Sequence, residues 1–270
     1  NGELLTSQNA TIPIAYYLHK GGARDDESKQ ALRRYLVHAL LNRIFSGSQD
    51  QLIVAFRNAF RIEVKTVGAP STFHRRFEKL TFQEILDVPL PAQKSLLVTE
   101  SDLDRFLGYA KGPDAFHVLT LLYPHLRFAD AVFHQDHMHP QSGFSDLALA
   151  KLQVPRDRWP EWYRSRDTVP NLQLLAGRRN SSKNDTALAP WMNVMSSGDR
   201  DSFTRENYFP RDVSLEFSDF LTFVEKRREV LRNALREKLA LAPVGSPSQL
   251  VDVEDLGNDV DADVDGRSNT

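Results

Sequence analysis

Two segments of this chain carry side chains that could together hold a metal ion and activate water. The first contains Asp136 and His137 at the end of an apolar–polar run, and the second opens at Asn171. Asn180 and Lys183 follow on a helix-forming stretch. An acid, a histidine and two amides in this order are what two strands and a helix need to bind one divalent cation and attack a phosphodiester. The sequence therefore predicts a metal-dependent nuclease.

The residue types assign a role to each position. His137 is the candidate general base, because the unperturbed pKa of histidine lies near neutrality. One Mg²⁺ (or Mn²⁺) ion prefers oxygen ligands and keeps several waters, so the Asp136 carboxylate and the Asn180 amide are the expected ligands. Asn171 is expected to brace the loop and orient the histidine. Lys183 lies three residues after Asn180, on the same helical face, and is expected to contact phosphate.

Neighbouring side chains of a strand point to opposite faces, which constrains this interpretation. Asp136 and His137 can serve one site only if the strand ends or bends there, and Pro140 favours such a break. His139 would share the face of His137, and could be a second ligand, a phosphate contact or a partly buried histidine. His134 could face the metal side or be a partly buried histidine.

The pattern DHxxP, then NLxLL, then NxxK resembles the HNH (His-Me finger) nuclease domain. It resembles more closely the carboxy-terminal half of GmrSD-type modification-dependent restriction endonucleases. The resemblance covers most of residues 10–240, including the runs Ile12–His19 and Ala31–Ser46, the LTLLYP segment before the finger and the closing run Phe217–Leu239. The finger motif is the specific part of the match.

This resemblance implies His137 as the general base, Asp136 and Asn180 as the metal ligands, and Asn171 as the middle asparagine of the motif. Two features depart from the family pattern. Many members have a histidine where this chain has Asn180, and an asparagine is a weaker ligand. Many also carry cysteine pairs that bind a structural zinc, whereas this chain has no cysteine, so the finger must be held by packing alone.

The implied function is a metal-dependent DNA endonuclease domain, nicking or cleaving, of a restriction or anti-phage defence protein. Its partner would be duplex DNA, and an NTP-binding domain or partner subunit would lie outside this chain. Two other functions remain open on the residues: a non-cleaving nucleic-acid-binding module with a degenerate finger, and a ribonuclease.

Charged residues are unevenly distributed along the chain. Residues 245–270 hold seven acids and one arginine against a whole-chain net charge of −2, so the remainder is net positive. Arg164 and Arg166 lie between the halves of the motif, and Arg178 and Arg179 immediately precede Asn180. Such clusters can follow a phosphate backbone, and the alternative is a solvated surface with arginine–carboxylate pairs.

The expected fold is mainly α, a helical body with an inserted ββα-metal (HNH) finger. Apolar residues recur at helical spacing in Ala31–Ser46 and Gln51–Ile62. The insertion Phe144–Pro170 contains prolines and two tryptophans, which suggests a folded loop with one short helix. The predicted divisions are a helical domain (1–112), the finger with its insertion (113–200), a C-terminal helix packed on the body (201–244) and an acidic disordered tail (245–270).

Composition agrees with a globular protein that is not in a membrane. Hydrophobic residues make up 41% of the chain, and no apolar stretch reaches the ~20 residues needed to span a bilayer. The first residues lack the features of a secretory signal, and the absence of cysteine fits a reducing cytoplasm. The chain begins without methionine, which suits a domain excised from a longer protein.

Overall fold

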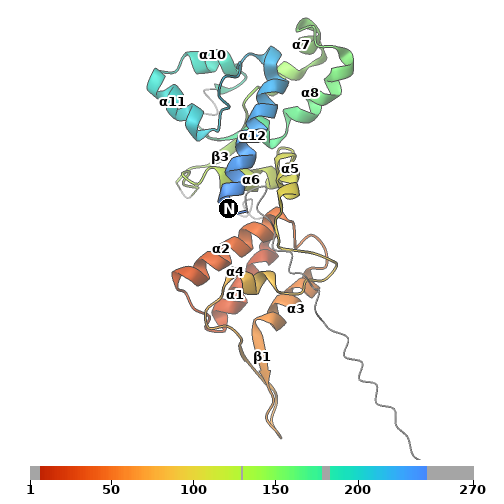
Figure 1. Ribbon diagram of the computed structural model, residues 1–270, viewed down its shortest axis with the longest axis vertical. Coiled ribbons are helices and arrows are strands. Elements are labelled where there is room, and N and C mark those ends of the chain that lie inside the picture. The colour runs from red at the N-terminus through yellow and green to blue at the C-terminus, as the bar shows by residue number, and fades with distance from the viewer. Residues whose placement is uncertain (1–6, 129, 178–182, 242–270) are drawn as a thin grey trace, which may run out of the picture.

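The computed structural model describes residues 7–128, 130–177 and 183–241, and the fold is mainly α, as predicted. The described residues form two separate two-stranded antiparallel sheets. β1 (Arg61–Val64) pairs with β2 (Thr72–Arg75), and β3 (Phe133–His137) pairs with β4 (Leu172–Ala176). Figure 1 shows an elongated molecule, with the β1–β2 hairpin projecting from one end and the β3–β4 pair embedded among helices nearer the other.

The amino-terminal helices form where apolar residues recur at helical spacing. α2 (Asp26–Leu41) begins after Asp25, whose side chain accepts a hydrogen bond from the Ser28 backbone amide at 3.0 Å. This cap satisfies one of the amides left unpaired at a helix start. The predicted run Ala31–Ser46 is therefore right in type, but the helix starts and ends earlier. The neighbouring elements are the 3₁₀ turn Gln8–Thr11, α1 (Ile12–His19), α3 (Gln49–Ala59) and α4 (Phe82–Leu86).

The run Gln51–Ile62, predicted as helix, is divided in the structure. α3 ends at Ala59 and the chain enters β1 at Arg61. Ile62 and Val64 are β-branched and favour extended backbone, so local propensity agrees with the strand. The hairpin formed by β1 and β2 was not predicted.

Three clusters of buried side chains form the core of the described residues. The first gathers α1 to α4, with Tyr35 and Phe56 in edge-on contact at 5.2 Å between ring centroids. The second joins α5 (Glu100–Leu107), α6 (Pro113–Leu122) and β4. The third surrounds the end of β3. The helix α12 (Phe220–Lys238) contributes to the second and third clusters, because Leu231 packs in the second and Phe223 in the third.

The insertion between β3 and β4 is folded, as predicted, but it holds two helices where one was expected. These are α7 (Asp146–Lys151) and α8 (Trp159–Arg166). Trp162 is buried against Phe144, with ring centroids 6.2 Å apart. After β4 come α10 (Leu188–Asn193) and α11 (Ser197–Glu206).

None of the described helices is both long enough and apolar enough to cross a bilayer. The division of the chain at residues 112, 200 and 244 stays a prediction. The predicted acidic tail, residues 245–270, lies outside the described residues.

Candidate functional site

β3 ends at His137, where the sequence required a break. Asp136 lies opposite Gln173 and His137 opposite Leu172 in the antiparallel register. Beyond the strand, the Met138 amide donates to the Asn171 carbonyl at 2.7 Å. The side chains of Asp136 and His137 therefore leave the strand at its last two positions, one on each face.

The ring of His137 is held by a carboxylate that the sequence analysis did not identify. Its Nε2 lies 2.8 Å from Oδ1 of Asp167, which directly follows α8. Arg166 donates to the other oxygen, Oδ2, from Nε at 2.9 Å and Nη2 at 2.6 Å. Burial raises the pKa of Asp167, but the hydrogen bonds from Arg166 and His137 outweigh it and lower the pKa overall. The carboxylate is thus ionised at neutral pH.

The charge of Asp167 fixes the tautomer of His137. An ionised carboxylate can only accept, so Nε2 must donate the hydrogen bond, and the lone pair of the neutral ring is on Nδ1. Burial lowers the pKa of His137 below its usual 6.5; the bond to Asp167 opposes this shift, and the nearby charge of Lys111 adds to it. Because the net pKa is lowered, the ring is neutral at pH 7 and can accept a proton.

Asp136 is tied to a buried lysine. Its Oδ2 accepts a hydrogen bond from Gln173 Nε2 at 2.8 Å and lies 2.9 Å from Lys183 Nζ. Lys183 is fully buried, and its Nζ also donates to the His137 carbonyl at 2.5 Å. The predicted phosphate contact of Lys183 is therefore corrected: the ammonium faces inward and ties the residues after β4 to the end of β3.

Asn171 braces the loop, as predicted. Its Nδ2 donates to the carbonyls of Arg166 at 2.7 Å and His139 at 3.2 Å, and its Oδ1 accepts from the His139 amide at 3.0 Å. Asn171 itself is fully buried. One amide side chain thus joins the segment after β3 to the segment that carries Asp167.

Arg227 of α12 fixes the same turn from the other side. The guanidinium is fully buried and donates through Nη1 to the carbonyls of Pro170 at 2.6 Å and Leu172 at 2.9 Å. Two further bonds, to the Asn207 carbonyl at 3.1 Å and the Tyr123 hydroxyl at 3.2 Å, use Nε and Nη2. Burial lowers the pKa of Arg227. Its bonds hold in place the 3₁₀ turn Val169–Asn171, which ends at Asn171.

The two further histidines differ in environment. His139 is fully buried, its ring nitrogens have no partner among the described residues, and Phe220 and Phe223 pack on it at 5.5 and 5.0 Å between centroids. Burial lowers its pKa to about 3. The structure therefore corrects the suggestion of a ligand or phosphate contact: His139 is a neutral core residue. His134 is exposed, two residues before Asp136 and hence on its side of β3.

Of the arginines predicted to contact DNA, the structure describes Arg164 and Arg166. Arg164 is exposed on α8. Arg166 donates to Asp167, and 27% of its side chain is exposed, so its contact with phosphate stays a prediction. Arg178, Arg179 and Asn180 lie outside the described residues.

Of the two predicted metal ligands, the structure describes one, Asp136. Both bonds to Asp136 from the described residues fall on Oδ2, and 14% of the side chain is exposed, so Oδ1 can serve a hard cation. Within residues 7–128, 130–177 and 183–241, no three His, Asp or Glu side chains gather as a metal centre. The donor set fits a cation that is held mainly by water and few protein oxygens.

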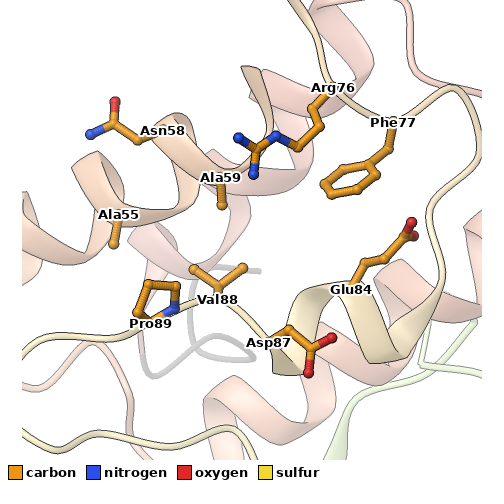
Figure 2. A pocket seen from close by; sticks show the side chains of 9 residues that line it. All are labelled: Ala55, Asn58, Ala59, Arg76, Phe77, Glu84, Asp87, Val88 and Pro89. Atoms are coloured by element: carbon orange, nitrogen blue, oxygen red, sulfur yellow. The ribbon is translucent and has the colours of Figure 1, made fainter. Parts of the chain in front are cut away.

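A surface pocket of about 530 Å³ lies elsewhere, in the amino-terminal part. Figure 2 shows Arg76 and Phe77 on one side of it, Glu84 and Asp87 on another, and small residues of α3 along its wall. None of the candidate site residues lines it. The described candidate residues therefore lie around the β3–β4 pair and not in this pocket.

The sequence analysis missed Asp167 and Arg227, among other residues of the site. An acid four residues before Asn171 was a usable signal, because antiparallel pairing brings the residues before β4 beside the end of β3. Arg227 gave no signal within its own helix. The assembled group is an oriented neutral imidazole, a partly exposed carboxylate and a braced loop, a set suited to removing a proton from water near a cation. Neither the models of known protein families nor the curated proteins compared with this chain match it.

Proposed function

We propose that this chain is a metal-dependent DNA endonuclease domain of the HNH (His-Me finger) type. The observation that carries the proposal is the bond between His137 and an ionised Asp167 at the end of β3, one residue from a carboxylate on the other strand face. A buried histidine with a purely structural role would not need an arginine-fixed acid to set its tautomer. The motif resemblance supports a role in restriction or anti-phage defence, in the cytoplasm, with sensing by another domain or subunit.

Each described residue has a part in this scheme. Nδ1 of His137 takes the proton from an attacking water, and Asp167 stabilises the resulting imidazolium. Asn171 and Arg227 hold the loop on which the ring is mounted. Lys183 fixes the Asp136 carboxylate against the strand end. A Mg²⁺ or Mn²⁺ ion, held by Asp136 and Asn180, would neutralise charge on the scissile phosphate and the leaving oxygen.

One observation favours a second function, a non-cleaving nucleic-acid-binding module. The Asp136 carboxylate is already paired with the buried ammonium of Lys183 at 2.9 Å. A cation on the same group therefore meets a neighbouring positive charge, which weakens its binding. In such a module the finger would hold its shape without a metal.

Incubation with supercoiled plasmid separates the two functions. The endonuclease should convert the plasmid to open-circle or linear forms with Mg²⁺ or Mn²⁺, and a chelator should stop the reaction. Intact plasmid with both ions, together with a retained gel shift, would select the binding module. Preferential degradation of RNA added to the same reaction would instead indicate a ribonuclease.

The acid Asp167 should set the pH dependence of cleavage. The base must be neutral, so activity is present above the pKa of His137 and is lost as the pH falls through it. Because this pKa is lowered, the acid limb should lie below pH 6.5. Asp167→Asn removes the bond and charge that raise the pKa of His137, so the limb should move to still lower pH.

The asparagine should also reduce kcat about 10- to 100-fold, because the amide can orient either tautomer of the ring. A pH–rate profile of both proteins measures this. Asp157→Asn, at an exposed position of the same insertion, is the matched control. An Asp167→Asn limb that coincides with wild type would remove Asp167 from the role of histidine partner.

A further inference from the structure

The β1–β2 hairpin is the part of the described chain that contributes least to its own core. We call residues 61–76 the arm. Residues 62–76 are all exposed, and none of the three core clusters includes a residue of the arm. Val67 at the tip is 103% exposed, and Ile62 and Val64 are 45% and 43% exposed. A two-stranded hairpin without a covering layer is marginally stable in water, so these side chains need a reason to be there.

The base of the arm is fixed to the body. Arg75 donates a hydrogen bond to the Gly21 carbonyl, and Lys20 Nζ donates to the Phe73 carbonyl at 3.4 Å. The Arg76 amide donates to the Phe60 carbonyl at 2.9 Å, directly below the hairpin. Figure 1 shows the result: β1 and its partner project from the end of the molecule farthest from α10 and α11. The arm is a projecting element on a fixed mount.

The register gives the arm two different faces. Arg61 pairs with Arg75 and Glu63 with Phe73, so these four side chains share one face. There the Arg61 guanidinium lies over the Phe73 ring, 3.9 Å from its centroid. The opposite face carries Ile62, Val64, Thr72 and His74. One face therefore carries two arginines, one glutamate and one aromatic ring, and the other carries two apolar and two polar side chains.

The charge of the arm selects its partner. Residues 61–76 contain four arginine or lysine side chains and one acid, Glu63. That acid is 4.0 Å from Lys65, which keeps 79% of its side chain exposed. Cations along a ribbon match a phosphate backbone, and a two-stranded ribbon fits a groove of duplex DNA. Apolar residues at such a tip, here Val67 and Pro70, can press against base edges or between base steps.

We infer that the arm is a ribbon that binds duplex DNA, and that it contacts the substrate at a place remote from His137. The inference deepens the proposed function and rests on it for the choice of DNA. In this scheme the arm binds the DNA and the β3–β4 region cleaves it. Duplex affinity should then depend on the arm while the chemical step does not.

Binding is measured by fluorescence anisotropy with a labelled duplex of about two helical turns, without divalent metal, in the His137→Ala background. The variants are Lys65→Glu and Val67→Asp, both at exposed positions of the arm. Their matched controls are Lys226→Glu on α12, a lysine also near a glutamate of its own element, and Leu97→Asp, 57% exposed before α5. Thermal unfolding checks that all four variants fold.

We expect Lys65→Glu to lower affinity roughly tenfold at low salt and to reduce the slope of log affinity against log salt by about 0.9, the loss of one phosphate contact. Val67→Asp should weaken binding at the same salt by a similar factor, and both controls should leave it within about twofold. Variants of the arm that bind like the controls would overturn the inference. So would a change in oligomeric state with unchanged DNA affinity, because the arm would then join copies of the chain.

The inference and the proposed function fail separately. Wild-type protein that binds duplex through the arm but leaves plasmid intact with Mg²⁺ and Mn²⁺ would refute cleavage and support the arm. Wild-type protein that cleaves plasmid, with KM unchanged in Lys65→Glu and Val67→Asp, would support cleavage and refute the arm. Duplex and single-stranded probes of equal length test the preference for a groove, and equal losses on both would overturn the assignment to duplex DNA.

Discussion

Replacing His137 with alanine is expected to reduce plasmid cleavage about 10²- to 10⁴-fold, the contribution of a positioned general base. The reason is geometric. The ring is fixed by Asp167 at 2.8 Å, and its pKa is lowered by burial, so it is neutral and oriented before substrate arrives. Initial rates of supercoiled plasmid loss, at saturating Mg²⁺, measure the effect.

The control for this variant must separate chemistry from folding. His137 is buried, so its loss also leaves a small cavity, and thermal unfolding of the variant must show a native transition. His125→Ala provides a matched histidine substitution at an exposed position and should cleave at the wild-type rate. A His137→Ala protein that is folded and retains a rate within threefold of wild type, on the order expected for noise in such assays, would end the proposal of a histidine base.

Arg227→Met is expected to produce the largest loss of stability, about 3–5 kcal/mol in the free energy of unfolding. The methionine preserves much of the side-chain volume but cannot donate. The carbonyls of Pro170 and Leu172 and a further carbonyl, that of Asn207, then lose their hydrogen bonds in a buried environment. Each unsatisfied group costs about 1–3 kcal/mol. Urea unfolding followed by circular dichroism measures the change.

Lys226→Met tests whether the effect belongs to the buried position. Lys226 is the preceding residue of α12, and its side chain is 50% exposed, so its replacement by methionine should change the free energy of unfolding by less than about 0.5 kcal/mol. Arg227→Lys should fall between the two, because one ammonium cannot replace a guanidinium fork that reaches several acceptors. If Arg227→Met and Lys226→Met unfold at the same urea concentration, the network around Arg227 contributes nothing to the fold.

The helices were largely predictable from the sequence, because their apolar spacing and starting residues are local features. α2 shows both, with an acid at its cap and apolar residues at helical spacing. The two-stranded arm was not predictable in this way. Ile62 and Val64 continue an apolar pattern that begins in α3. Their pairing with His74 and Thr72 joins residues that are distant in sequence, and hydrophobic periodicity does not record such pairing.

The candidate site was predictable in some of its members and less so in their roles. Asn171 was correctly expected to brace, because an amide can donate and accept within a turn. Lys183 was misplaced because spacing tells which residues share a helical face but not whether that face is inward. The same limit applies to His139, which is enclosed by phenylalanines of α12. Asp167 is distant from His137 in sequence. Its role could be recognised only once the structure placed its carboxylate beside the imidazole ring.

The long insertion between β3 and β4 has a consequence for the order of assembly. The strands can pair only after residues 138–171 have closed a loop, and loop closure costs entropy before any contact repays it. The phenylalanines that enclose His139, and the guanidinium beneath Asn171, come from α12, near the end of the described chain. On the ribosome the helices that precede β3 can therefore form before α12 emerges, and the imidazole takes its place only after α12 has been made. Under the proposed function, a nascent chain whose α12 has not yet emerged from the ribosome does not cleave nucleic acid.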